Sequence, residues 1–252
     1  MHVLGGPRGD LPTPGRYELP LIERRPESPS AVTFRFSTRG TGFRYLSNQA
    51  VRLSLPGVDD PWGAVRTFSL SSSPSEEGVL AITCKISDTP FKRALDRLAP
   101  GATAQVYGPL GSFLLDTARP CAFVAGGIGI TPFRGMLRFA GDRHVAVPLT
   151  LVYSARVPEE LVFRDELDRI ASDRANVRIH YTVTRPGDSV RPWSGRVGRI
   201  DGRWLAECVP AERRGRWYVA GLPEMVAGTV SILTRELGAS PDDVDYELFR
   251  GF

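Results

Sequence analysis

A glycine-rich turn between an apolar run and a helix start is the first candidate for chemistry in this chain. The apolar run ends at Ala125, Gly126–Thr131 follows, and Pro132 occupies a position that favours the first turn of a helix. Glycines let a backbone approach a diphosphate closely, and the N–H groups of a helix N-terminus attract negative charge. The pattern favours nucleotide binding, and Thr131 can cap the helix. A tight strand-to-helix connection without a ligand also needs glycine.

A second candidate is Arg66–Ser69, where an arginine, an aromatic ring and a hydroxyl lie close together. The guanidinium of Arg66 suits a phosphate, the ring of Phe68 suits a planar ligand, and Ser69 suits the edge of that ligand. In a strand, Arg66 and Phe68 share one face while Ser69 points to the other. An ordinary half-buried strand that runs into a serine-rich turn explains the same pattern.

Composition and charge exclude several other classes of function. The chain has 252 residues, of which 42% are hydrophobic and 24% charged, and its net charge of +4 comes without a basic block that would favour nucleic acid. Cys84, Cys121 and Cys208 lie far apart, so we expect buried thiols in a reducing compartment and no iron–sulfur site. No histidine has metal-ligand spacing. No signal-peptide core or membrane-length apolar run is present, which predicts a cytoplasmic protein without a membrane partner.

The elements that must position these motifs change character near residue 115. Short alternating strands come first and are typical of a small antiparallel barrel, with one short helix predicted over 90–98. Strands and helices then alternate, which predicts a parallel sheet with helices on both faces and ligands at the carboxyl ends of its strands. The expected divisions are a flexible N-terminus over 1–15, an antiparallel β-barrel domain over 16–114 and an α/β domain over 115–252.

In the α/β domain the periodicity predicts individual elements. The expected strands are 121–125, 149–153, 177–184, 217–220 and 243–248. The expected helices are 132–139, 163–171, 203–208 and 223–237.

Five motifs in order resemble the ferredoxin–NADP reductase superfamily. They are Arg66–Ser69, Gly108–Phe113, Gly126–Pro132, Ala220–Met225 and Glu247–Phe249. Each motif alone is weak, but their order and domain-scale spacing, from about residue 17 to the C-terminus, make a specific signal. The chain is most similar to short stand-alone reductases that lack a fused iron–sulfur domain.

The resemblance implies a flavin in the barrel, FAD rather than FMN. Arg66 would contact the flavin phosphates and Phe68, which replaces the usual tyrosine, would pack against the isoalloxazine ring. The backbone N–H groups of Phe91 and Lys92, helped by the Lys92 charge, would hold the diphosphate. The implied flavin-binding set is Arg66, Thr67, Phe68, Ser69, Phe91 and Lys92.

The resemblance also implies that NAD(P)H binds to the α/β domain. Its diphosphate would lie on the turn, whose binding residues are Gly126, Gly127, Gly129, Ile130 and Thr131. The nicotinamide side would be formed by Gly221, Leu222 and Met225, next to Ala220, where many relatives have cysteine. Contacts to a 2′-phosphate would come from Ser154, Arg156 and Arg185, which favours NADPH over NADH, although surface arginines in loops explain these residues equally well.

Near the C-terminus, the resemblance implies an acidic residue and an aromatic residue beside the flavin. Ser69, at the flavin N5 edge, and Glu247, hydrogen-bonded close to it, form the expected catalytic pair. Phe249 or Phe252 would cover the flavin ring; a core side chain and a chain end without a ligand are the alternatives.

The predicted activity is that of a flavin-dependent NAD(P)H oxidoreductase. A hydride would pass from NADPH to FAD, and single electrons would pass to a separate acceptor protein, first of all ferredoxin. The alternatives are an electron-transfer subunit of a larger complex and a non-enzymatic flavin or nucleotide sensor.

Overall fold

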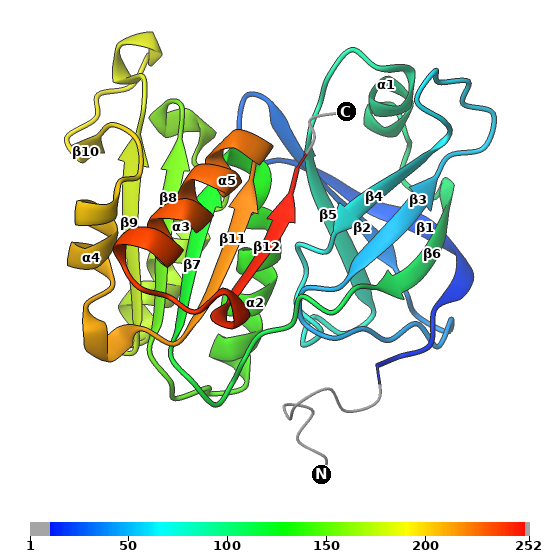
Figure 1. Ribbon diagram of the computed structural model, residues 1–252. Coiled ribbons are helices and arrows are strands. Elements are labelled where there is room, and N and C mark those ends of the chain that lie inside the picture. The colour runs from blue at the N-terminus through cyan, green and yellow to red at the C-terminus, as the bar shows by residue number, and fades with distance from the viewer. Residues whose placement is uncertain (1–10, 250–252) are drawn as a thin grey trace.

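The computed structural model describes residues 11–249, which form two six-stranded sheets side by side (Figure 1). The first sheet is antiparallel, and a bridge between Leu70 and Ile82 joins its two edges into a nearly closed barrel. Its strands, in spatial order, are β4 (Val65–Ser69), β3 (Ala50–Ser54), β6 (Thr103–Leu110), β1 (Gly15–Pro26), β2 (Ala31–Ser37) and β5 (Val79–Lys85).

The barrel encloses its core because its strands alternate. In β3, Val51 and Leu53 are buried while Arg52 between them is exposed. The short helix α1 (Pro90–Asp96) starts with Pro90 behind Thr89, whose hydroxyl accepts the N–H of Lys92 at 3.3 Å. The apolar residues of this helix pack into the barrel core, and the helix lies at one end of the barrel (Figure 1).

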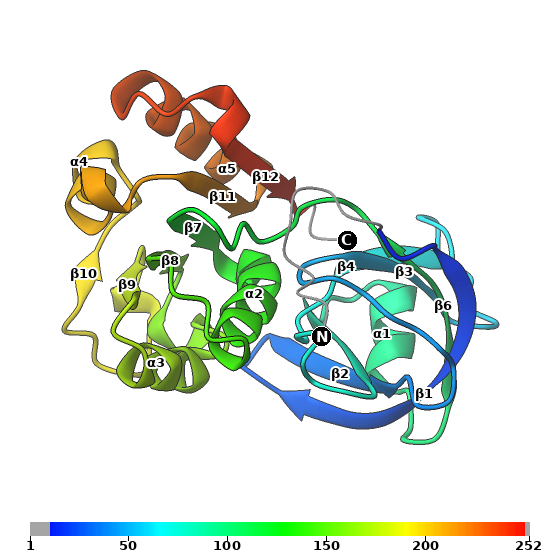
Figure 2. The same ribbon diagram turned by 90° about the horizontal axis from the view of Figure 1, so that it is seen from below.

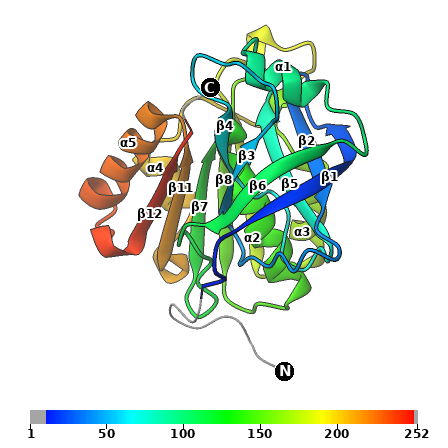
Figure 3. The ribbon, with the colours of Figure 1, turned by 90° about the vertical axis from the view of Figure 1, so that its right-hand side faces the viewer.

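The second sheet is parallel and carries helices on both faces. α2 (Thr131–Asp142) and α3 (Arg164–Asp173) cover one face, and α4 (Gly202–Cys208) and α5 (Pro223–Ser231) cover the other (Figure 3). Its strands, in spatial order, are β10 (Arg196–Val197), β9 (Val177–Val183), β8 (Leu149–Ala155), β7 (Cys121–Gly126), β11 (Arg216–Gly221) and β12 (Val244–Leu248).

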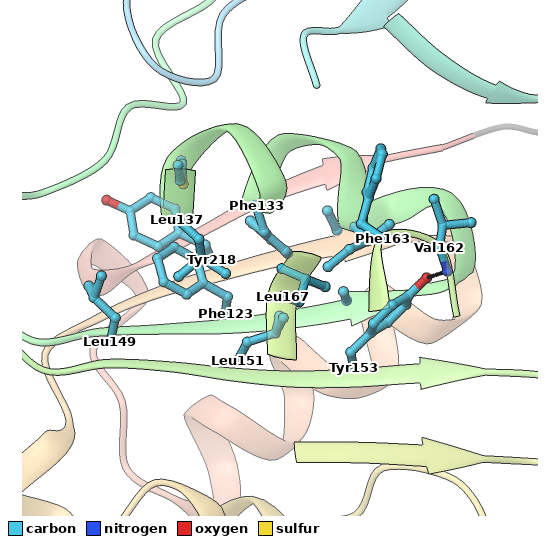
Figure 4. Packing of buried hydrophobic residues seen from close by; sticks show 14 of the residues in the cluster. Phe123, Phe133, Leu137, Leu149, Leu151, Tyr153, Val162, Phe163, Leu167 and Tyr218 are labelled. Atoms are coloured by element: carbon cyan, nitrogen blue, oxygen red, sulfur yellow. Dashed lines mark hydrogen bonds between the residues drawn. The ribbon is translucent and has the colours of Figure 1, made fainter. Parts of the chain in front are cut away.

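Apolar side chains from α2 and α3 pack on the sheet in one continuous cluster. Phe123 lies against Phe133 and Tyr218, with ring centroids 5.2 and 5.4 Å apart (Figure 4). Figure 4 also shows Leu151 and Leu167 between the sheet and α3. One side of α2 is therefore packed against the sheet, and its other side faces the barrel (Figure 2).

The strand order reverses between β7 and β11. β8 and β9 follow β7 in the chain and lie on one side of it in the sheet. The chain then crosses back, so that β11 and β12 lie on the other side of β7. Ligands of such sheets bind at the carboxyl ends of the strands at this reversal. Here those ends are Gly126 and Gly221.

The predicted fold class is confirmed: an antiparallel barrel is followed by a parallel α/β sheet. The predicted helix over 223–237 is partly wrong, because α5 ends at Ser231 and a π-helical turn covers 232–236. The proposed domain boundary after residue 114 lies in the connection between β6 and β7 and stays a prediction. All three cysteines are free and buried, as expected. Within the described residues, no helix has the length and apolar character needed to cross a membrane.

Candidate active site

The glycine turn is built by close approach of two strand ends. A single 3-10 turn, Gly127–Ile130, follows β7 and leads directly into α2. A Cβ on Gly129 would lie 2.2 Å from the carbonyl oxygen of Ala220, and one on Gly126 would lie 3.1 Å from the Met225 sulfur. Glycine at these positions therefore lets the turn pack directly against the end of β11 and the start of α5.

Thr131 does not cap α2, which corrects the sequence-based expectation. The helix starts one turn earlier as the 3-10 segment, so Ile130 is the capping residue and Thr131 is the first helical residue. The Thr131 hydroxyl is buried and has no hydrogen-bond partner among the described residues. An unpartnered buried hydroxyl at a helix N-terminus fits an anionic ligand, because it supplies a donor beside a positive dipole end.

The nicotinamide-side residues lie next to this turn. A Cβ on Gly221 would lie 3.3 Å from the Cα of Gly126 and 3.0 Å from the Met225 sulfur. Leu222, which follows Gly221, is 61% exposed. The carboxyl ends of β7 and β11 therefore form one continuous surface.

In the barrel, Arg66 lies in a buried cluster with an internal carboxylate. Its Nη2 is 2.9 Å from an oxygen of Asp60, and its Nη1 donates to the carbonyl of Trp62 at 3.1 Å. Its guanidinium carbon lies 5.1 Å from the centre of the Phe91 ring. The Arg66 Nε is buried without a hydrogen-bond partner in the described part of the chain, so one donor remains for a ligand.

Asp60 is the residue that sequence reasoning missed. Its carboxylate accepts the backbone N–H of Phe91 at 2.9 Å, which is one of the two N–H groups expected to hold a diphosphate. Burial opposes ionisation of Asp60, but the N–H groups of Phe91 and Trp62 and the Arg66 guanidinium hold its pKa below the usual value. A carboxylate in a Pro- and Gly-containing turn is too common a pattern for the sequence to single out.

Lys92 is a buried cation beside the candidate flavin strand. It is 5% exposed, and its ammonium lies 4.8 Å from the centre of the Phe68 ring. Within the described ranges it has no carboxylate in ion-pair distance, and the thiol of Cys84 is its polar neighbour. Lysine is seldom buried without an anionic partner, because loss of hydration is costly. Lys92 and the unpartnered Nε of Arg66 therefore fit the phosphate groups of a bound flavin.

The two aromatic residues of the barrel set lie together. The ring centroids of Phe68 and Phe91 are 6.2 Å apart with an angle of 30° between their planes. Thr67, by contrast, is exposed on the opposite face of β4.

Ser69 and Glu247 connect the two sheets. The hydroxyl of Ser69 donates to the Glu247 carboxyl at 2.7 Å, across the junction between β4 and β12. Glu247 pairs in register with Ala220, next to the glycine turn. Burial raises the Glu247 pKa to about 7, and the Ser69 hydrogen bond opposes this shift. The structure thus places a carboxyl that titrates near neutrality between the two candidate binding regions.

The expected 2′-phosphate residues meet at the ends of β8 and β9. The N–H of Arg185 donates to the carbonyl of Arg156 at 2.8 Å, and Ser154 pairs in register with Gly126. Arg156 is already paired with Asp188 at 2.9 Å, with both side chains exposed. The site thus offers two arginines and one opposing carboxylate.

Of the two C-terminal aromatics, the structure describes one. The N–H of Phe249 donates to the carbonyl of Gly221 at 2.9 Å, and its half-buried ring packs on the apolar cluster of the α/β domain. Phe252 lies outside the described residues.

Comparisons with known proteins point to one family. Residues 123–231 match the family model described as an oxidoreductase NAD-binding domain. The chain is 33% identical to ferredoxin–NADP reductase B of Sorangium cellulosum over 92% of its own length and 97% of that protein. It is also 34% identical to the stachydrine N-demethylase reductase subunit Stc4 of Rhizobium meliloti, over 73% of this chain but only 52% of that one.

Solved structures share the fold at lower identity. A ferredoxin NADP⁺ reductase from Neisseria gonorrhoeae with bound FAD and NADP matches with a TM-score of 0.76 and 22% identity, over 94% of this chain and 99% of that one. The cytochrome b5 reductase domain of Ulva prolifera nitrate reductase matches with a TM-score of 0.78 and 20% identity, over 92% and 97%. Given the near-complete match to the Sorangium protein, this chain belongs to the ferredoxin–NADP reductase superfamily of FAD-dependent NAD(P)H oxidoreductases.

Proposed function

We propose that this chain oxidises NADPH, holds FAD in its barrel and delivers electrons to a separate carrier protein of the ferredoxin type. The observation that carries the proposal is the hydrogen bond of 2.7 Å between Ser69 and Glu247. It brings the strand that bears Arg66 and Phe68 next to the strand end that borders the glycine turn. A hydride donor and its acceptor must meet at such a junction.

In the barrel, different residues would contact the phosphates and the planar ring of the flavin. Arg66 and Lys92 would neutralise the flavin phosphates, with Phe68 as the nearby planar surface. Asp60 keeps Arg66 in place by its ion pair and would restrict how many of its donors reach the ligand. When bound, FAD supplies a hydride acceptor that can release its electrons one at a time.

On the α/β side, the turn from Gly126 to Thr131 would hold the diphosphate of NADPH. The donors would be backbone N–H groups at the start of α2 and the Thr131 hydroxyl, which has no partner among the described residues. Gly221 and Met225 would form the wall beside the nicotinamide, and Phe249 would limit access of water from the C-terminal side. Arg156 and Arg185 would contact the 2′-phosphate.

Ser69 and Glu247 would control a proton at the reacting edge. Below about pH 7 the Glu247 carboxyl holds a proton, and above it the carboxylate accepts the hydrogen of the Ser69 hydroxyl. The pair would thereby keep a polar, exchangeable proton beside the flavin without admitting bulk water.

The acceptor is proposed from two supports. The Sorangium relative is named a ferredoxin–NADP reductase and is matched over nearly its whole length. The net charge of +4 suits an acidic carrier. An oxygenase component is the second candidate, because the Rhizobium relative and a 32% identical relative in Chromohalobacter salexigens are named reductase subunits of a demethylase and of a glycine betaine monooxygenase.

Coupled reduction assays test the proposal. Protein reconstituted with FAD should bleach at flavin wavelengths under anaerobic NADPH, and should reduce cytochrome c only when a ferredoxin is added. An artificial acceptor serves as the control for NADPH oxidation itself. Bleaching without ferredoxin-dependent transfer would reject ferredoxin as acceptor, whereas the absence of bleaching would reject the NADPH reaction.

A further inference from the structure

The helix that begins at the glycine turn is tied to the barrel by a buried arginine. Arg134 lies one turn into α2, and its Nη1 donates to the backbone carbonyl of Ser71 at 3.0 Å. Ser71 lies two residues beyond Ser69 in the chain. One side chain therefore links the candidate nucleotide helix to the segment that continues from the candidate flavin strand.

The same guanidinium is held by two carboxylates from different elements. Glu76, in the turn between β4 and β5, accepts from Nη1 and Nη2 of Arg134. Glu166, on α3, accepts from Nε at 3.0 Å and lies 2.8 Å from Nη2. Burial opposes ionisation of Glu76, but Arg134 holds its pKa below the usual value. The rigid fork of arginine makes such an arrangement directional as well as attractive.

Backbone contact reinforces this link. A Cβ on Gly135 would lie 2.9 Å from the carbonyl oxygen of Ser72, so α2 touches the barrel backbone directly. From the barrel side, the Tyr45 hydroxyl is bonded to the Ser72 hydroxyl at 2.7 Å and donates to the Ser73 carbonyl at 2.8 Å. The segment 71–73 is therefore held from both sides, between the barrel and α2 (Figure 2).

We propose that Arg134 is a positioning residue for hydride transfer, which sets the separation between the NAD(P)H turn and the flavin strand. This inference rests on the proposed function and assigns a role to a residue that touches neither ligand. A buried ion network contributes little net stability, but it selects one geometry. Loss of this link would let the two sheets shift relative to one another. Hydride transfer does not tolerate such a shift, since a displacement of about 1 Å can cost about 100-fold in rate.

Three variants and one control test this role in the FAD-loaded protein. Arg134→Met removes the fork, and Arg134→Lys keeps the charge without it. Arg134→Met combined with Glu76→Gln and Glu166→Gln removes the fork without leaving buried carboxylates unpaired. Arg143→Met is the matched control, because Arg143 lies at the C-terminal cap of the same helix, is exposed, and has its guanidinium carbon 5.8 Å from the centre of the Phe139 ring, away from this network.

Two readouts separate geometry from binding. We expect single-turnover flavin reduction by NADPH to fall at least about tenfold in all three variants, with the NADP⁺ dissociation constant within about twofold of wild type. In flavin-free protein, amide hydrogen exchange over 69–76 should accelerate at least about tenfold, because this segment loses its restraint. Arg143→Met should change neither quantity.

Several results would overturn the inference. These are an unchanged reduction rate in the triple variant, a loss of NADP⁺ affinity as large as the loss of rate, or full recovery in Arg134→Lys. If the wild-type protein is not reduced by NADPH, the proposed function fails. Exchange over 69–76 in flavin-free protein then still decides whether Arg134 restrains this segment, and unchanged exchange would overturn that role.

Discussion

The two halves of the active site prepare for negative charge in different ways. In the α/β domain the proposed donors are backbone N–H groups and one buried hydroxyl, that of Thr131, and this hydroxyl has no partner in the described chain. In the barrel the donors are side chains, and Asp60 already binds Arg66 and the N–H of Phe91. The α/β half therefore has a donor without a protein partner among the described residues, while the barrel half contains an internal carboxylate and Lys92, which has no carboxylate in ion-pair distance within residues 11–249.

This difference indicates how each half would select its negatively charged ligand. A site built from backbone N–H groups requires the ligand to approach the main chain closely. Its affinity is therefore expected to depend on added side-chain atoms at the turn more than on side-chain charge. A side-chain site depends on a balance of charges, so it is sensitive to each ionisable group. Variants of each kind can break or sharpen the contrast.

The largest effect is expected from Gly129→Ala. The new Cβ would lie 2.2 Å from the Ala220 carbonyl oxygen, so the turn and β11 must separate. Overpacking of this kind costs about 1–3 kcal/mol, and the displaced turn should lower NADPH oxidation about 100-fold. Thermal unfolding and steady-state kinetics measure both.

Gly141→Ala is the control for this variant, since Gly141 lies in α2, the helix that follows the turn, and has open space around it. It should stabilise the protein by up to about 1 kcal/mol through helix propensity. A Gly129→Ala protein with wild-type unfolding temperature and turnover would show that close approach is not what the turn requires.

In the barrel, Lys92→Met should produce two effects of opposite sign. The dissociation constant for FAD should rise at least about tenfold, about 1.4 kcal/mol, because the phosphates lose a cation. The flavin-free protein should unfold at a higher temperature, because a buried ammonium without a carboxylate partner is removed. Flavin fluorescence titration and thermal unfolding measure them.

Arg93→Met is the matched control for Lys92, since Arg93 is the next residue, is exposed, and pairs with Asp88 at 2.7 Å. Unaltered FAD affinity in Lys92→Met would place the flavin phosphates elsewhere.

A smaller effect is expected at the coenzyme's 2′-phosphate. Arg156→Ala should lower the ratio of kcat/KM for NADPH over NADH by about tenfold. Asp188→Asn should raise this ratio, because it frees Arg156 from its ion pair. Arg203→Ala, an exposed position on α4, is the control. Equal changes in kcat/KM for NADPH and NADH would mean that Arg156 does not contact the 2′-phosphate.

The smallest effect on catalysis is expected from Glu247→Gln, whose consequences appear in the pH dependence. The Glu247 pKa lies at about 7 rather than the usual 4.5, so the folded state binds the proton more tightly. Wild type should therefore lose stability relative to the variant as pH rises from about 4.5 to 7, by less than about 1.4 kcal/mol per pH unit. Urea unfolding at several pH values measures this.

Flavin reduction in wild type should also change a few-fold across pH 7, and the variant should be flat. Glu224→Gln, on an exposed position of α5, should keep the wild-type profile. A wild-type profile without an inflection near neutrality would remove Glu247 from the reaction.

Much of this architecture could be read from patterns along the chain. The short alternating strands expected before residue 115 and the apolar run of 121–125 predicted barrel strands and a buried parallel strand, and the structure has such strands in β3 and β7. Helix ends were predicted less well. The 3-10 turn before α2 and the π turn after α5 depend on how each helix meets the sheet, which periodicity does not record.

The amino-acid sequence by itself determined the elements, their order and the glycine turn, because these depend on local spacing and backbone freedom. Only the tertiary structure decided which groups share a site. Asp60 meets the N–H of Phe91, Arg134 meets Glu76, and Ser69 meets Glu247, 178 residues away in the chain. Such pairs form only when strands and helices that are distant in the chain pack together. The hydrogen-bond geometry and the electrostatic environment of each pair therefore depend on the tertiary structure.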